Sequence, residues 1–139
     1  MNKAIFILNE YHHHIIYPPD VLESIKAQVA VVEPFYTKES IQDNLSVLED
    51  VTILFSGWGC PKLDAAFLAH APNLKAVFYG AGSVRGFVTP EFWAREIVLS
   101  NSASINAEPV AYFTFSQIIY GLKGGWHHVR YGDAYRDQK

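Results

Sequence analysis

The sequence predicts an α/β fold in which five parallel strands form one doubly wound sheet. Short apolar runs alternate with segments of helical periodicity through the first hundred residues, and glycine, proline or polar residues separate them. This alternation is typical of right-handed βαβ units, whose parallel strands are covered by helices on both faces. Five strands in this rhythm favour the flavodoxin-like strand order 2-1-3-4-5, followed here by one long C-terminal helix.

The predicted strands are the short, continuous apolar runs, because strands buried on both faces lack the alternation of half-exposed ones. They cover residues 3–9, 29–33, 51–56, 74–79 and 97–100. The histidine-rich segment 12–17 is predicted as a loop.

Four helices are predicted between the strands. Proline is favoured at the first helical position, so one helix is expected to start at Pro18-Pro19-Asp20 and another at Thr89-Pro90. Apolar residues at helical spacing predict two more, over 40–48 and 62–70. We expect Asn106 to cap the last helix, which continues to about Lys123 and is followed by a short, loosely held polar tail.

Composition excludes several classes of protein. A chain of 139 residues that is 50% hydrophobic suits one folded domain and excludes a disordered one. The net charge of −3, with scattered signs, argues against a nucleic-acid or polybasic membrane surface. The single cysteine excludes a disulfide framework and a multi-cysteine zinc site. No apolar segment reaches the ~20 residues of a membrane span, so a cytoplasmic protein is expected.

Two carboxyl ends of the predicted strands are rich in glycine, at Gly57-Trp58-Gly59 and from Tyr79 to Ser83. Ligands of open parallel sheets bind beyond these ends. Glycine lets backbone N–H groups approach an anion closely, and successive N–H groups form an anion-binding nest. This edge therefore predicts a site for a small anion, although tight strand-to-helix turns alone would also explain the glycines.

The Gly80-x-Gly82 sequence resembles the start of the dinucleotide-binding fingerprint but does not complete it. Arg85 stands where the third glycine belongs, no helix is predicted to open at once, and no acidic residue ends the next predicted strand. We therefore predict no cofactor site in this chain.

The histidines and the cysteine give weaker signals. His12, His13 and His14 are consecutive, so in an extended loop they cannot all face one metal ion. These histidines and the pair His127-His128 are therefore expected to be solvated rather than to bind a metal. Cys60 is expected to be a small buried thiol, although its place at a helix start could lower its pKa. Arg85 is expected to face solvent, the alternative being a pair with a carboxylate ligand.

The last predicted helix is apolar on nearly every face. A helix of this kind must be buried all round, yet a sheet that already carries helices can cover only one side of it. It predicts contact with a second domain or with another copy of the chain. Its apolar residues are Val110, Ala111, Tyr112, Phe113, Phe115, Ile118, Ile119, Tyr120 and Leu122.

Three segments closely resemble the substrate domain of D-isomer-specific 2-hydroxyacid dehydrogenases: GWGCP at 57–61, APNLKAVFYGAGSV at 71–84 and NAEPVAYFT at 106–114. The likeness extends over about residues 40–124. The last segment resembles the family's linking helix to the NAD domain, with Tyr112 in place of the usual glutamate. The resemblance implies a substrate domain over 1–104, the linking helix over 105–124 and a polar tail over 125–139, with the NAD-binding domain absent.

The resemblance also implies a set of substrate-binding residues for a 2-oxo or 2-hydroxy acid. The turn at 57–59 would line the cleft, the loop at 79–83 would hold the carboxylate through its N–H groups, and Asn101 would mark the cleft edge. These residues are Gly57, Trp58, Gly59, Tyr79, Gly80, Ala81, Gly82, Ser83 and Asn101.

The family's catalytic arginine, glutamate and histidine, like its NAD(H) or NADP(H) site, follow the linking helix and have no counterpart in this sequence. No catalytic, cofactor-binding or metal residue is therefore assigned, and the chain alone is expected to show no turnover.

Three other classes of protein compete with this interpretation. A flavodoxin-type electron carrier needs a phosphate-binding loop after the first strand, where this chain has Asn9-Glu10-Tyr11. A phosphorylation receiver needs an aspartate at the end of the third strand, where Ser56 stands. A stand-alone module that binds a small anion or regulates remains open, as does self-association through residues 106–123.

Overall fold

The protein forms one five-stranded parallel sheet of order β2-β1-β3-β4-β5, as the sequence predicts. The structure, a computed structural model, describes residues 1–136, with side chains through residue 132. The chain divides into two compact units after Ala103, and the sheet lies in the first. The strands are β1 (Lys3–Ile7), β2 (Ala30–Val31), β3 (Ile53–Ser56), β4 (Ala76–Tyr79) and β5 (Val98–Asn101).

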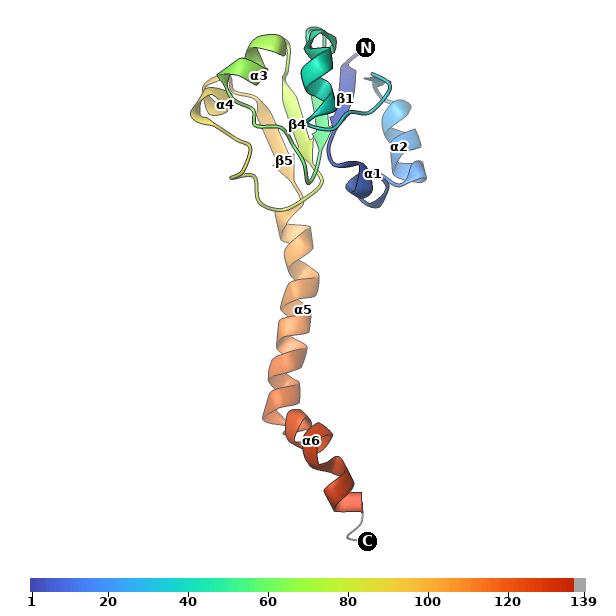
Figure 1. Ribbon diagram of the computed structural model, residues 1–139, viewed down its shortest axis with the longest axis vertical. Coiled ribbons are helices and arrows are strands. Elements are labelled where there is room, and N and C mark those ends of the chain that lie inside the picture. The colour runs from blue at the N-terminus through green and yellow to red at the C-terminus, as the bar shows by residue number, and fades with distance from the viewer. Residues whose placement is uncertain (137–139) are drawn as a thin grey trace. The chain divides into compact units, whose positions relative to one another are not determined.

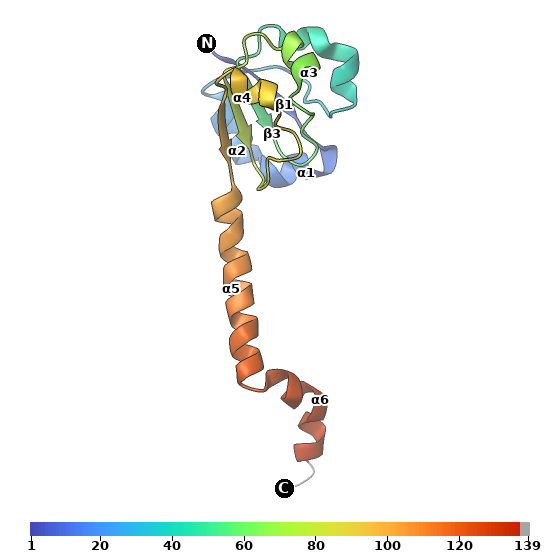
Figure 2. The ribbon, with the colours of Figure 1, turned by 90° about the vertical axis from the view of Figure 1, so that its left-hand side faces the viewer.

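Helices lie on both faces of the sheet (Figure 1). One face carries α1 (Glu10–Ile16) and α2 (Pro19–Lys26). The other carries the 3-10 helix η1 (Ser40–Leu48), α3 (Ala65–His70) and α4 (Pro90–Ala94), and η1 lies beside α3 in both views (Figures 1 and 2). The strands of the sheet, with their carboxyl ends, therefore lie between these two layers of helices.

Two apolar cores follow from the alternation of side chains along β1. Ile5 and Ile7 belong to the larger core under η1, α3 and α4, whereas Phe6 and Leu8 belong to the smaller one under α1 and α2. All four are essentially inaccessible to solvent. This arrangement explains why β1 is apolar at every position after Lys3, since a central parallel strand buries both of its faces.

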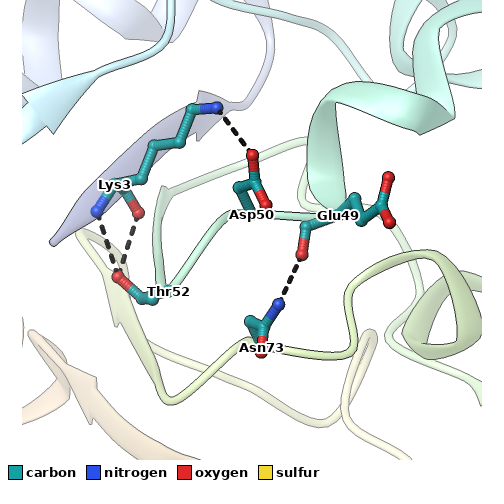
Figure 3. A network of polar contacts seen from close by, with 5 residues as sticks. All are labelled: Lys3, Glu49, Asp50, Thr52 and Asn73. Atoms are coloured by element: carbon teal, nitrogen blue, oxygen red, sulfur yellow. Dashed lines mark hydrogen bonds and ion pairs between the residues drawn. The ribbon is translucent and has the colours of Figure 1, made fainter.

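Polar contacts tie the loops together at the amino ends of the strands (Figure 3). The Thr52 N–H donates to the Lys3 carbonyl oxygen at 2.9 Å, and the Lys3 N–H donates to Thr52 Oγ1 at 3.2 Å. The Asn73 side-chain amide donates to the Glu49 carbonyl oxygen at 2.8 Å. Lys3 also pairs with Asp50 at 3.4 Å, but both side chains are exposed, so the pair contributes little. These contacts secure the edge of the sheet opposite the candidate site.

The structure corrects several boundaries. Of the segment predicted as a loop over 12–17, residues 12–16 belong to helix α1. The helix predicted over 62–70 begins only at Ala65, where the Asp64 carboxylate accepts the Phe67 N–H at 3.1 Å. The predicted Thr89 cap is confirmed, because Thr89 Oγ1 accepts the Phe92 N–H at 3.3 Å.

The second unit contains helices α5 (Ala103–Leu122) and α6 (Gly125–Arg136), and Figure 2 shows the bend between them. The predicted Asn106 cap is wrong, because α5 begins three residues earlier. Helix α6 lies where a loosely held tail was predicted. Taken by itself, α5 exposes apolar side chains, and none of the described helices is long and apolar enough to cross a membrane. The exposed apolar side chains include Val110, Tyr112, Phe113, Phe115, Ile118, Ile119 and Leu122.

Candidate functional site

The register of the sheet brings the predicted site residues to one edge. Ser56 of β3 pairs with Tyr79 of β4, which pairs with Asn101 of β5. The loops that follow these three strands are therefore neighbours. The Ser102 N–H also donates to the Ala81 carbonyl oxygen at 3.0 Å, which joins the end of β5 to the loop after β4.

The loop after β4 contains consecutive backbone N–H groups without acceptors, of which those of Gly82 and Ser83 belong to accessible residues, whereas Ala81 is fully buried. The Gly80 N–H donates to the Ser56 carbonyl oxygen at 2.9 Å. In the described part of the chain, no acceptor takes a hydrogen bond from the N–H of Ala81, Gly82 or Ser83. The successive N–H groups of Gly82 and Ser83 are therefore the ones that a carboxylate can reach.

Tyr79 lies at this edge only through its backbone. Its side chain is buried in the larger core, where its ring packs on that of Phe87 with centroids 4.6 Å apart. Burial raises the pKa of the Tyr79 hydroxyl above its ordinary value. The side chain therefore supports the loop and stays neutral.

Asn101 has a structural role at the same edge. Its side-chain oxygen accepts the Ala103 N–H at 3.0 Å and satisfies a backbone donor at the start of α5. The amide nitrogen of the side chain makes no hydrogen bond within the described residues and is available to a ligand.

Helix α1 is the part of this edge that the sequence did not reveal. The Asn9 N–H donates to the Trp58 carbonyl oxygen at 2.8 Å, and the His12 ring lies against the Trp58 ring with centroids 4.7 Å apart. Asn9, His12 and Ile16 recur at helical spacing, a signal that the histidine run obscured.

The glycines at the edge make room for α1. A Cβ atom on Gly57 would stand 2.3 Å from Ile16 Cδ1, and one on Gly80 would stand 2.2 Å from Ile16 Cγ2. Gly59 has a φ of +93°, and its Cβ would stand 2.0 Å from Asn9 Oδ1. Close packing therefore explains these glycines, which leaves the run at Ala81–Ser83 as the stronger sign of an anion site.

Tyr17, just after α1, ties that helix to the strand ends. Its hydroxyl donates to the Ser56 carbonyl oxygen at 2.7 Å and lies 3.3 Å from the Phe78 carbonyl oxygen. Burial raises the pKa of Tyr17 well above its usual range, so the hydroxyl remains a donor.

Cys60 is a poor nucleophile in this setting. Burial raises the pKa of its thiol to about 12, partly offset by a hydrogen bond with Ser56. The thiolate that nucleophilic chemistry requires is therefore scarce near neutral pH. This result argues against the alternative in which a helix start lowers the thiol pKa.

The described residues do not form a metal or dinucleotide site. Within residues 1–136, no three His, Cys, Asp or Glu side chains gather closely enough to hold a metal ion. After Gly80 the next helix opens only at Pro90, so no helix N-terminus follows the loop at once. These residues do not fit the pyrophosphate of a nicotinamide dinucleotide, which binds where a helix begins at the glycine turn.

His13 is buried on the α1 side of the sheet, and we expect it to make the free energy of unfolding sensitive to acid. Its ring stacks on Phe35 with centroids 4.2 Å apart, and its Nδ1 has no partner in the described residues. Burial, with a smaller contribution from His14, lowers its pKa from 6.5, although Glu33 acts in the opposite direction. Above pH 6.5 the histidine is neutral in both the folded and the unfolded chain. As the pH falls below 6.5, the unfolded chain binds the proton first, so the free energy of unfolding decreases until the pH has fallen through the lower folded-state pKa.

The test replaces His13 by phenylalanine, which keeps the ring stack and removes the titration. Urea unfolding midpoints measured above and below the ordinary histidine pKa should fall less for His13→Phe than for the wild type. Replacing the exposed His70 by alanine is the control and should keep the wild-type pH dependence. An equal loss in the wild type and His13→Phe would contradict the assignment.

Comparison with known proteins shows similarity of structure without close similarity of sequence. No sequence-family model matches the chain, and no significant match to a curated protein was found. A phosphoglycerate oxidoreductase from Rhizobium etli superposes with a TM-score of 0.71 over 96% of this chain, at 17% identity. The pyruvate reductase of Chlamydomonas reinhardtii gives 0.56 over 95% at 14% identity. An acyclic imino acid reductase in complex with NADPH and D-Arg gives 0.55 over 95% at 17% identity.

The chain spans only part of these structures, 42% of the first, 39% of the second and 41% of the third. At such identities the likeness establishes the fold, and it agrees with the resemblance drawn from the sequence. The chain therefore has the fold of the part of these oxidoreductases that it covers.

Proposed function

We propose that this chain is the substrate-binding domain of a D-isomer-specific 2-hydroxyacid dehydrogenase. The observation that carries the proposal is the run of N–H groups at Ala81, Gly82 and Ser83, at the carboxyl edge of a parallel sheet. The shared fold supports it, and so do the three sequence segments that resemble this family.

The ligand would be a 2-oxo or 2-hydroxy acid bound by its carboxylate. Hydrogen bonds from backbone N–H groups to an ionised carboxylate are stronger than those between neutral groups. Trp58, whose side chain is exposed, supplies an apolar wall beside this loop, and Asn101 stands at its edge.

The proposed function for this chain is binding of the acid and does not include hydride transfer. In the proposed family the reaction needs NAD(H) or NADP(H) and an acid/base histidine, and neither has matching residues in this sequence. We therefore propose that the 139 residues alone bind the acid without turnover, and that the apolar side chains of α5 contact an NAD-binding domain or a second copy.

Replacing Ser83 by proline removes one N–H donor from the proposed carboxylate site, while Ser83→Ala keeps it. We expect Ser83→Pro to weaken pyruvate binding by roughly ten- to a hundredfold, since a hydrogen bond to a charged group contributes about 1.5–3 kcal/mol. Chemical shifts of ¹⁵N-labelled protein during a pyruvate titration measure the affinity. In the wild type the amide signals of Ala81, Gly82 and Ser83 should move most.

Two results would count against the proposal. One is the absence of pyruvate-dependent shifts at these three amides in the wild type. The other is equal weakening by Ser83→Pro and Ser83→Ala, which would show that the Ser83 hydroxyl, and not its N–H, accounts for the change. A stand-alone module for other small anions would instead bind phosphate or sulfate in preference to pyruvate at the same amides.

A further inference from the structure

His12 contains a buried ring nitrogen, Nδ1, that no hydrogen-bond partner satisfies within the described residues. Its ring lies against Trp58 at 4.7 Å and meets the Tyr11 ring edge-on at 5.1 Å. The residue as a whole is partly exposed. Buried polar atoms are nearly always paired, so this arrangement calls for an explanation.

The burial of Nδ1 determines which nitrogen of the neutral ring carries the proton. A proton on Nδ1 would place an N–H donor in a buried position without an acceptor, which is the costlier arrangement. The proton therefore resides on Nε2, so the polar group that His12 can offer to a ligand is an N–H donor.

The position of α1 places the His12 ring beside the candidate site, against Trp58 of the loop after β3. His12 precedes Ile16 by one helical turn, so the two side chains share a face of α1. Ile16 lies directly over both Gly57 and Gly80. The same face therefore covers the junction of the loops after β3 and β4, and the second of these loops contains Ala81–Ser83.

We propose that His12 determines specificity by donating from Nε2–H to an oxygen on the carbon chain of a bound 2-oxo acid. The inference rests on the proposed function, since the carboxylate must occupy the loop at Ala81–Ser83. A neutral N–H donor recognises a hydroxyl or carbonyl oxygen. Every 2-oxo acid carries the carbonyl oxygen at carbon 2, so discrimination requires a second acceptor on the chain. The ligand class is therefore a short 2-oxo acid with a hydroxyl group at carbon 3, and pyruvate, which lacks that hydroxyl, binds more weakly.

The test compares hydroxypyruvate with pyruvate in NMR titrations at a pH well above the ordinary histidine pKa. The wild type should bind hydroxypyruvate roughly three- to tenfold more tightly, the range that one neutral hydrogen bond provides. His12→Ala should bind both acids alike, and His12→Gln, which keeps an N–H donor, should retain part of the preference. His14→Ala changes an exposed neighbour on α1 and should behave as the wild type.

The ¹⁵N shifts of the histidine rings provide a readout that does not depend on binding, and they should show the Nε2–H form for His12. Finding Nδ1–H, or a preference for hydroxypyruvate that survives in His12→Ala, overturns the role of His12 and leaves the carboxylate site standing. Equal binding of the two acids by the wild type would also overturn the role of His12 while leaving the carboxylate site standing. If neither acid shifts the amides of Ala81–Ser83, the proposed function fails and this inference fails with it.

Discussion

Gly59→Ala is expected to lower the free energy of unfolding by about 2–6 kcal/mol. Two costs combine at this position. The φ of +93° is strained for an alanine, at about 1–3 kcal/mol. The added Cβ would also stand 2.7 Å from the Asn9 backbone nitrogen and 2.0 Å from its Oδ1, and overpacking costs about 1–3 kcal/mol.

Asn9 cannot simply move aside to relieve the second cost. Its N–H donates to the Trp58 carbonyl oxygen at 2.8 Å, and its own carbonyl oxygen accepts the His12 N–H at 3.0 Å. A shift of Asn9 would therefore disturb both the turn after β3 and the start of α1.

Gly86→Ala provides the matched control. A Cβ on Gly86 meets no atom within 4 Å, and its φ is not in the left-handed region. This substitution should change stability by no more than about 0.5 kcal/mol. Urea denaturation of both variants measures the difference, and a Gly59→Ala protein within 1 kcal/mol of Gly86→Ala would contradict the account.

The sequence predicted the sheet well because its strands are unusually uniform. Runs such as Ala4 to Leu8 are apolar at every position, and only a strand or helix buried on both sides tolerates that pattern. Proline and threonine at 89–90 likewise fixed the start of α4, because their effects on a helix start are local.

Helix α1 escaped prediction because tertiary contacts stabilise it more than its own sequence does. Three histidines give little helix propensity, and no side chain caps its start. What holds the helix is its contact with the strand ends through Asn9, Ile16 and Tyr17. Such contacts join residues about 40 to 65 positions apart in sequence, which local patterns do not encode.

The sequence predicted an anion-binding role for the glycines at the site, but close packing against α1 explains part of their presence. The sequence suggested that Gly57 and Gly80 expose backbone amides to an anion. In the structure, the Gly80 N–H already donates to the Ser56 carbonyl oxygen. Ile16 fills the space that a side chain at either glycine would need. Sequence alone could not separate these explanations, because it does not reveal which helix lies over the loop.

Alanine at Gly57 and at Gly80 should each cost about 1–3 kcal/mol, and changes at Ile16 should distinguish the two. The Gly57 methyl would meet Ile16 Cδ1, whereas the Gly80 methyl would meet Cγ2. Ile16→Val removes Cδ1 and keeps Cγ2, and the restricted χ1 of a β-branched side chain in a helix holds Cγ2 in place. Ile16→Val should therefore rescue Gly57→Ala and leave Gly80→Ala destabilised, while Ile16→Ala should relieve both.

Double-mutant cycles in urea measure the coupling for each pair. The expected coupling between Gly57→Ala and Ile16→Val is about 1–2 kcal/mol in the direction of rescue, against near zero for Gly80→Ala with the same valine. Additive costs in every pair would mean that Ile16 does not contact the two glycine positions closely.

The same variants also test function. If packing accounts for both glycines, a methyl group at Gly80 that is compensated by Ile16→Ala should leave the amides of Ala81–Ser83 free to bind pyruvate. The binding capacity of this edge would then belong to the loop beyond Gly80, and the glycines would serve to bring α1, with His12, close to it.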